Sequence, residues 1–215
     1  MKLYDYHRST ASYRVRIALY LKQCHFDCIP VHLVRAGGEQ HLPAYRALNP
    51  QGLVPTFVND DAEVITQSLA ILEYLEEQYP TPPLLPKDKF ARATVRSLAL
   101  LVACDIHPLN NLRVLKHLKT VFHASEDEIT AWYHHWLKAG FDAFEAKLQQ
   151  HPRKNSLFCD GDTVSFADIC LIPQVFNANR FEFSLEPYPL IQAINHHCLT
   201  LDAFQKTAPE SSINK

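Results

Sequence analysis

The spacing of apolar residues divides the chain into a part with a mixed pattern and a part with a helical pattern. In about the first 80 residues, short runs rich in Val, Ile and Tyr predict strands, and apolar residues recurring every three or four positions predict helices. The predicted strands cover residues 3–6, 27–33, 54–58 and 62–65, and the predicted helices cover residues 14–21 and 67–78. Pro30 favours an edge position for the second strand, because proline cannot donate a hydrogen bond to a neighbouring strand.

A proline-rich segment ends the mixed part. Four prolines within residues 79–86 cannot continue a helix and predict a stiff, extended linker. Beyond it almost every segment has the helical period, with one long run over residues 90–105 and a break expected near Pro108. We therefore expect an α/β domain over residues 1–80, a linker over 81–87 and an all-helical domain over 88–215.

Two pairs of polar residues mark the starts of helices in this second part. Ser125 and Glu128 place a hydroxyl and a carboxylate three positions apart, which is the spacing of a capping box. Ser165 and Asp168 repeat the arrangement before another apolar run. The sequence therefore predicts one helix that opens after Ser125 and runs to about residue 150, and another that opens after Ser165.

Composition and charge exclude several classes of protein. The formal net charge of −2 gives no basic field that would attract nucleic acid or an anionic membrane. No stretch approaches the ~18 apolar residues that span a bilayer. The six cysteines are scattered, which is typical of a reduced, cytoplasmic protein rather than a secreted disulfide scaffold. Cys24 and Cys28 lack a second ligand pair at zinc-finger spacing, so we expect no metal site.

Three hydroxyls lie where the first predicted strand gives way to the first helix. Ser9, Thr10 and Ser12 can be explained by capping alone, because Ser and Thr are preferred at helix N-termini. The same geometry also suits an anion, since free N–H groups and the positive end of the helix dipole meet there. A thiol of pKa ~8.5 is only about 3% ionised at pH 7, so a site of this kind can convert a bound thiol into a nucleophile.

A second cluster lies at Val54-Pro55 and at Gln67-Ser68. Pro55 stands between a loop and a strand, where a cis peptide can turn the backbone of Val54 toward an extended ligand. Gln67 and Ser68 open a helix whose N-terminus can hold a carboxylate. Taken alone, each piece is equally well explained as an ordinary turn or an ordinary cap.

As a set, motifs along the whole chain resemble the zeta-class glutathione transferases. They are the hydroxyl-rich turn followed by Arg-Val-Arg-Ile-Ala-Leu, and the segments 47–50, 54–55, 67–71, 73–76, 79–82, 105–115, 165–168 and 173–181. The resemblance implies a thioredoxin-like N-terminal domain followed by an all-helical glutathione transferase C-terminal domain. It also implies glutathione as the cofactor and pairing of two copies as a homodimer.

The resemblance assigns roles to individual residues. Ser9, with Thr10 nearby, would orient the glutathione sulfur as the catalytic hydroxyl. The residues implied to bind glutathione are Ser9, Thr10, Ala11, Gln40, Val54, Pro55, Gln67, Ser68, His107, Asn111 and Arg113. Arg8, Arg113 and Arg180 would hold the carboxylates of a dicarboxylate substrate, a task that suits the planar guanidinium. A surface salt bridge is the alternative explanation for each arginine.

The implied reaction is the cis–trans isomerisation of a maleyl keto acid, with maleylacetoacetate from aromatic amino acid (tyrosine) catabolism as the first candidate. The family signature carries a cysteine where this chain has Ala11, a change that also fits maleylpyruvate as the substrate. Two alternatives remain open: a general glutathione transferase that conjugates small electrophiles, and a glutathione-binding module without catalysis.

Overall fold

The computed structural model describes residues 1–151 and 156–209 and divides them into two compact units. One unit comprises Met1–Pro83 together with the described residues that follow Leu199. The other unit is Leu84–Leu199. The proline-rich linker predicted from the sequence therefore lies at the boundary between them.

Four strands among the described residues of the first unit form a single sheet in the order β2-β1-β3-β4. The strands are β1 Lys2–Asp5, β2 Asp27–Pro30, β3 Thr56–Val58 and β4 Val64–Thr66. β1 runs parallel to β2 and antiparallel to β3, and β3 runs antiparallel to β4. The strand that ends at Pro30 lies at the sheet edge, as its proline predicts.

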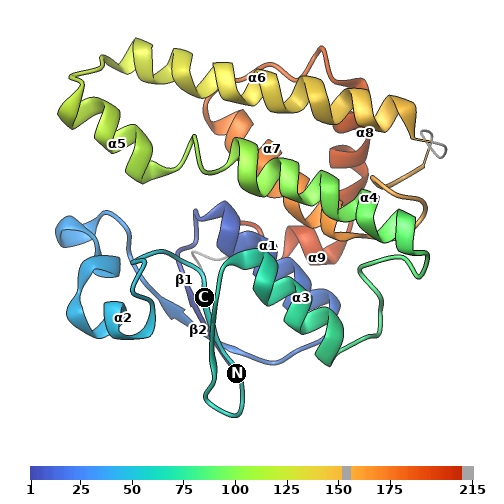
Figure 1. The fold of residues 1–215 in the computed structure, drawn as a ribbon, viewed down its shortest axis with the longest axis horizontal. Helices are drawn as coiled ribbons and strands as arrows, with labels where there is room; N and C mark the ends of the chain where they lie inside the picture. Colours follow the sequence, from blue (N-terminus) through green and yellow to red (C-terminus); the bar gives the residue numbers. More distant parts are fainter. Residues whose placement is uncertain (152–155, 210–215) are drawn as a thin grey trace. The chain divides into compact units, whose positions relative to one another are not determined.

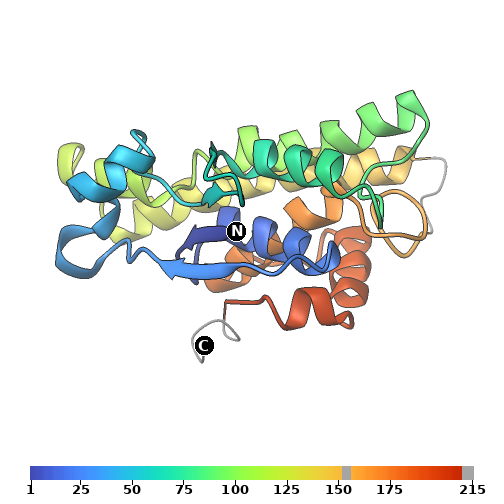
Figure 2. The same cartoon turned by 90° about the horizontal axis from the view of Figure 1, so that it is seen from below.

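Helices cover both faces of this sheet. α1 Thr10–Leu21 and α3 Ser68–Gln78 pack side by side, while α2 Pro43–Leu48 lies on the opposite side of the sheet in both views (Figures 1 and 2). Leu3 and Phe57 of the sheet are fully buried, as are Ile17 and Leu72 of the helices, because both helices present apolar residues to the sheet. The order βαβ, irregular segment, ββα agrees with the thioredoxin-like prediction.

An ion pair joins α1 and α3 where α1 ends. Lys22 Nζ lies 2.6 Å from Glu76 Oε2 and also donates to the carbonyl of Pro82 at 2.6 Å. The Lys22 side chain is completely buried, so this cation is held by its partners rather than by water. Lys22 therefore connects both helices to the start of the linker.

The C-terminal segment belongs with the first unit, whereas the sequence places it in the helical domain over residues 88–215. Within it, the short helix α9 Asp202–Gln205 packs against α1. The Tyr13 hydroxyl donates to the carbonyl of Phe204 at 2.7 Å, and Arg16 Nε donates to that of Thr207 at 2.9 Å. These long-range hydrogen bonds are the physical reason for the difference. Residues 210–215 of the predicted domain lie outside the described residues.

The second unit is helical throughout its described ordered elements, apart from one isolated bridge between Phe158 and Gly161. Its helices are α4 Lys89–Leu100, the π-helical turn Leu101–Ile106, α5 Leu112–Val121, α6 Glu126–Gln150, α7 Phe166–Arg180 and α8 Pro189–Cys198. The helix break expected near Pro108 falls between the π-helical turn and α5. α7 is buried along most of its length and packs against α4 and α8, so it forms the centre of this unit.

Both predicted helix starts are confirmed by side-chain hydrogen bonds. At α6, the Glu128 carboxylate accepts from the Ser125 N–H at 2.7 Å, and the Glu128 N–H donates to Ser125 Oγ at 3.3 Å. At α7, Asp168 Oδ2 accepts from the N–H and the hydroxyl of Ser165 at 2.8 and 2.7 Å. No helix within the described ranges is both long enough and apolar enough to cross a membrane.

Candidate functional site

Three of the predicted segments of the first unit adjoin one end of the sheet. Tyr4 near the end of β1 pairs with Thr56 at the start of β3, and Thr56 pairs with Thr66 at the end of β4. The turn before α1, the Val54-Pro55 segment and the N-terminus of α3 therefore all adjoin the same row of residues. The topology brings together three segments that the sequence separates by up to 60 residues.

Ser9 caps α1 and leaves its hydroxyl hydrogen available. Its Oγ accepts a hydrogen bond from the Ser12 N–H at 3.2 Å, and its own N–H donates to the Tyr6 carbonyl at 2.8 Å. A hydroxyl has two lone pairs and one hydrogen, so accepting from Ser12 still allows Ser9 to donate outward. The two explanations of this hydroxyl, helix cap and donor to a bound anion, are thus compatible.

The neighbours of Ser9 differ in exposure. Ser9 is half-buried, whereas Thr10 is only 2% exposed and Ala11 is also buried. Arg8 is exposed at the turn. The first turn of α1 contains no acidic residue, so no like charge opposes an anion at the positive end of its dipole. Ser9 is the hydroxyl of this group best placed to meet a ligand.

The N-terminus of α3 has no side-chain cap. Gln67 precedes it with a φ of 70°, and its amide donates to Gln51 Oε1 at 2.7 Å instead of accepting from the helix. Ser68 is buried, and its Oγ accepts from Arg14 Nη1 at 3.3 Å. An uncapped first turn exposes N–H groups that have no partner within the helix, and a carboxylate satisfies them.

The Val54–Pro55 peptide bond is cis, as the sequence predicts. Leu53 is fixed because its carbonyl accepts from the Tyr45 hydroxyl at 2.6 Å and from Asn49 Nδ2 at 2.8 Å. The backbone N–H and C=O of Val54 make no hydrogen bond with any residue that the structure describes. An extended peptide can pair with these two open groups, as in strand addition.

Gln40 lies in the irregular segment, in the turn Glu39–His41. Its Nε2 donates to the Leu33 carbonyl at 3.3 Å. Its Oε1 is buried without a hydrogen-bond partner among residues 1–151 and 156–209. A buried acceptor without a partner costs free energy, so a donor supplied by a ligand would stabilise this side chain.

Two arginines of α1 have roles that the sequence reading did not assign. Arg14 is 1% exposed and reaches from α1 to Ser68 at the start of α3, so its charge lies between the two helix N-termini. Arg16 is also buried and forms an ion pair with Asp5. The signal available in the sequence is the presence of two arginines in a helix that is otherwise buried on every side.

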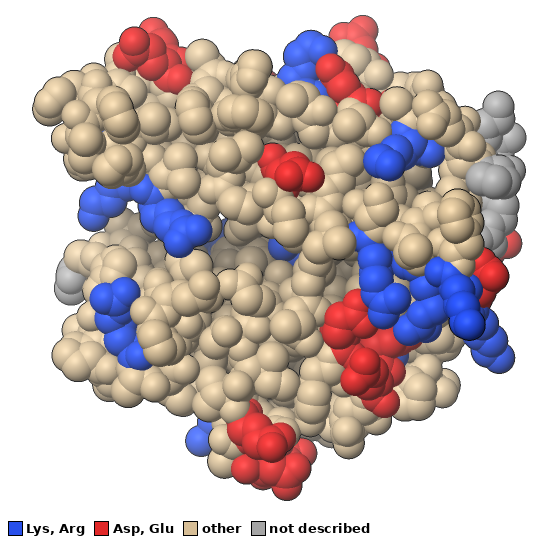
Figure 3. Space-filling model, in the orientation of Figure 1, with Lys and Arg blue, Asp and Glu red and all other residues tan. Residues whose placement is uncertain are grey.

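The remaining predicted residues lie in the helical unit. Asn111 caps α5, where its Oδ1 accepts from the Arg113 N–H at 3.1 Å, and His107 lies just before it in the helix break. Arg113 is exposed, and basic side chains gather along α5 in the space-filling view (Figure 3). Arg180 is exposed at the end of α7, where its Nη1 donates to Asn177 Oδ1 at 3.0 Å. The arginines are thus accessible to an anionic ligand.

Three of the protein's own thiols are poor candidates for a nucleophile. Burial raises the pKa of Cys24, of Cys159 and of Cys198, which disfavours their thiolate forms. All six cysteines are free within the described chain. The described residues also contain no group of three or more side chains placed to hold a metal ion.

Comparisons with known proteins find a matching family model, curated relatives and solved structures. Residues 3–83 match the family model of the glutathione S-transferase N-terminal domain. A maleylpyruvate isomerase from a Ralstonia species is 51% identical over 210 residues, which cover 97% of each chain. The holo structure of a maleyl pyruvate isomerase, described as a bacterial glutathione S-transferase of the zeta class, has a TM-score of 0.93 and 49% identity over 98% of both chains. A maleylacetoacetate isomerase from Methylobacterium extorquens AM1, solved with bound malonate and glutathione, has a TM-score of 0.93 and 38% identity over 98% of this chain and 97% of that one.

Proposed function

The chain belongs to the zeta-class glutathione transferases, and we propose that it converts a maleyl keto acid from the cis to the trans isomer with glutathione as cofactor. The observation that carries the proposal is the sheet end at which Ser9, the open backbone of Val54 and the uncapped N-terminus of α3 adjoin one row of paired residues. Relatives with this reaction align with nearly the full length of the chain.

The residues of the first unit fit a tripeptide with two carboxylates and a thiol. The Ser9 hydroxyl would donate a hydrogen bond to the sulfur, with Thr10 and Ala11 beside it in the first turn of α1. Val54, before cis Pro55, pairs with the cysteinyl backbone. The γ-glutamyl carboxylate meets Gln67, Ser68 and the free N–H groups of α3. Gln40 reaches the glycyl end, where its buried Oε1 gains a donor.

When bound, glutathione supplies a thiolate for reversible addition to the conjugated double bond, which allows rotation about a single bond before the sulfur leaves. The protein's part is to keep the sulfur ionised and to hold the substrate. Ser9 and the α1 dipole favour the negative charge. Arg8, Arg113 and Arg180 hold the substrate carboxylates through paired N–H donors, and His107 and Asn111 contribute to the glutathione site.

Two keto acids fit this chemistry, maleylacetoacetate and maleylpyruvate, because both join a cis double bond to a carboxylate and a ketone. We place the reaction in the breakdown of aromatic compounds, with the tyrosine route as the maleylacetoacetate case. Conjugation of small electrophiles is the second candidate function, since the same ionised sulfur attacks them. The accessible arginines favour a carboxylate-bearing substrate over a neutral electrophile.

We also propose a homodimer in the cytoplasm. The free state of all six cysteines in the described chain supports a reducing compartment. Phe90 on α4 is 81% exposed and is an apolar group that a second copy can cover. Light scattering of the purified protein tests the dimer: a mass twice the 24.6 kDa of one chain supports it, and a single-chain mass refutes it.

The test of function is a direct assay of both cis keto acids. The purified protein should convert at least one of them to its trans isomer with glutathione present and be inactive without it. Chlorodinitrobenzene serves as the electrophile control and should react far more slowly. Conversion of neither keto acid, together with rapid conjugation of the control, would favour the general transferase. Glutathione binding without conversion of either keto acid or of the control would favour the non-catalytic glutathione-binding module, and absence of glutathione binding would refute all three.

A further inference from the structure

We propose that Arg16 is a positioning residue, which fixes the turn that presents Ser9 to the glutathione sulfur. The inference rests on the proposed function and adds a residue to which the sequence reading gave no role. Arg16 lies two turns into α1 and has no access to a ligand, since it is only 4% exposed. It acts through the backbone that leads to Ser9.

The turn between β1 and α1 is the segment on which Arg16 acts. Its ends are joined by the hydrogen bond from the Ser9 N–H to the Tyr6 carbonyl at 2.8 Å. Arg16 Nη2 donates to the carbonyl of His7 at 3.1 Å, in the middle of this turn. Holding that carbonyl sets the plane of the peptide unit between His7 and Arg8, and hence the direction in which the chain enters Ser9.

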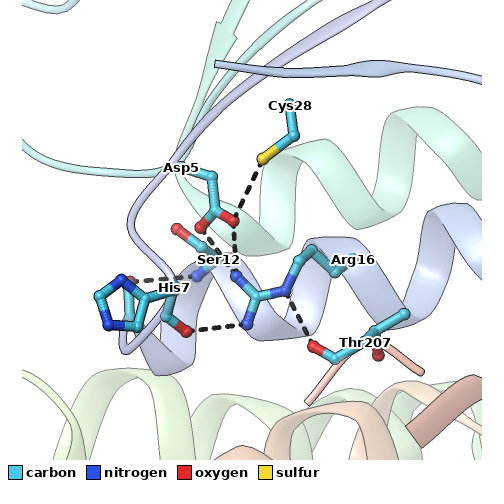
Figure 4. A network of polar contacts seen from close by, with 7 residues as sticks. Asp5, His7, Ser12, Arg16, Cys28 and Thr207 are labelled. Atoms are coloured by element: carbon cyan, nitrogen blue, oxygen red, sulfur yellow. Dashed lines mark hydrogen bonds and ion pairs between the residues drawn. The ribbon is translucent and has the colours of Figure 1, made fainter. Parts of the chain in front are cut away.

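Arg16 is itself anchored in two further directions. Its Nη1 lies 2.8 and 2.6 Å from the two carboxylate oxygens of Asp5, the last residue of β1. Its Nε donates to the carbonyl of Thr207 in the C-terminal segment at 2.9 Å. Figure 4 shows the guanidinium between these three groups. A planar guanidinium has five N–H donors in a fixed fork, so one side chain can hold strand, turn and C-terminal segment together.

Burying the Arg16–Asp5 ion pair costs desolvation free energy, which indicates that the pair has a role beyond packing. Both side chains of the pair are nearly inaccessible to water. Counting side-chain atoms alone, the exposed fraction is 5% for Arg16 and 3% for Asp5. Replacing a buried ion pair with apolar residues of similar size is often neutral or stabilising, so stability alone does not require a pair here. What apolar residues cannot supply is a donor to the His7 carbonyl. The geometry thus favours control of the Ser9 turn.

The C-terminal segment becomes part of the same support. The Tyr13 hydroxyl holds the Phe204 carbonyl at 2.7 Å, one helical turn from Arg16 on α1. Through Thr207, the segment then orients the guanidinium that contacts His7. Residues almost 200 positions apart therefore meet at the turn that carries the catalytic hydroxyl.

The test variant is Arg16→Lys. Lysine keeps a cation opposite Asp5, but a single ammonium cannot hold Asp5, His7 and Thr207 at once. We expect a folded protein in which the thiol pKa of bound glutathione, followed by thiolate absorbance, rises by about one pH unit. Since one unit is a tenfold change in thiolate below the pKa, kcat measured at a pH below both thiol pKa values should fall roughly tenfold, with KM for the keto acid nearly unchanged.

The matched control is Arg46→Lys. Arg46 is exposed and also donates to a backbone carbonyl, that of Pro50, at 3.2 Å. We expect the wild-type thiol pKa and kcat in this variant. If Arg16→Lys shows the wild-type thiol pKa, or loses activity only in proportion to the fraction unfolded, the positioning role is refuted.

Two further outcomes are also decisive. If Arg16→Lys does not fold, the thiol pKa and kcat are measured instead on the double variant Asp5→Asn/Arg16→Gln, which buries no charge. Failure of that variant to fold as well would make Arg16 a purely structural residue and overturn the proposal. Wild-type protein that binds glutathione with a lowered thiol pKa but isomerises no keto acid would refute the proposed function instead, because the thiol titration needs no substrate.

Discussion

The hydroxyl of Ser9 is expected to serve both the helix and the chemistry, and a series of substitutions separates the two. Ser9 Oγ accepts from the Ser12 N–H at 3.2 Å, so removing it removes the cap of α1. Replacing a serine cap with alanine costs about 1 kcal/mol, whereas replacing it with glycine costs only a few tenths. Ser9→Gly therefore removes the hydroxyl donor with little loss of stability. Ser9→Ala removes the hydroxyl donor and also the stability that the cap contributes.

The catalytic loss follows from the charge on the bound sulfur. A hydrogen bond to a charged group contributes about 1.5 to 3 kcal/mol, and Ser9 is half-buried, so the lower end of that range applies. At about 1.4 kcal/mol per pH unit, losing it raises the pKa of the bound thiol by roughly one unit. At a pH below both thiol pKa values, Ser9→Gly and Ser9→Ala should then isomerise the keto acid about tenfold more slowly than the wild type.

The assay combines three measurements on the wild type and on the glycine, alanine and threonine variants. Thiolate absorbance gives the pKa of bound glutathione, thermal unfolding gives stability, and the rate is followed from pH 6 to pH 9. Ser9→Thr keeps a hydroxyl and should resemble the wild type. In Ser9→Gly the rate defect should shrink as the pH rises, because the thiol then ionises without help. A glycine variant with the wild-type thiol pKa and rate would show that Ser9 is only a cap.

Three further predictions concern stability. Lys22→Met removes a completely buried cation from its carboxylate and should cost about 3 kcal/mol in urea unfolding, whereas Lys138→Met, which breaks an exposed pair, should cost less than about 0.5 kcal/mol. Gly140→Ala should destabilise the protein by about 1 kcal/mol, because its new Cβ collides with buried Ile106 and this outweighs the gain in helix propensity; a more stable variant would contradict this packing. Burial, and then a neighbouring arginine, lower the pKa of His7, so its contribution to stability is present above about pH 6.5 and is lost as the pH falls. The difference in melting temperature between wild type and His7→Gln should thus decrease from pH 7.5 to pH 5.5, and an increase would refute the shift.

Local patterns predicted the elements whose causes are local. The capping boxes at Ser125 and Ser165 could be read directly, because each depends on residues three positions apart. Pro30 marks the edge strand, and the place of Pro55 between loop and strand allows the cis bond that the structure has there. α1 nevertheless begins at Thr10, four residues before the predicted start, because polar residues in its buried first turn hide the apolar pattern.

Features that depend on contacts between distant residues left no local signal. A helical pattern places the C-terminal segment in the helical domain, and nothing near Phe204 indicates that the Tyr13 hydroxyl donates to its carbonyl. Elements of this kind require the three-dimensional arrangement of the chain.

The residues of the candidate site also divide into those with a local signal and those without one. The hydroxyls and helix starts were found because they lie at junctions between elements, where capping signals are strong. No local pattern marks the arginines of α1, although they stand in a helix whose neighbouring residues are nearly all buried. Inside such a helix a charge is costly unless specific partners meet it. Arg14 contacts Ser68 at the start of α3, and Arg16 contacts the turn before Ser9, so each connects α1 to a different part of the proposed glutathione site. A charge buried where the pattern calls for an apolar residue therefore indicates function more specifically than a hydroxyl at a helix start, because capping alone explains the hydroxyl and packing alone does not explain the charge.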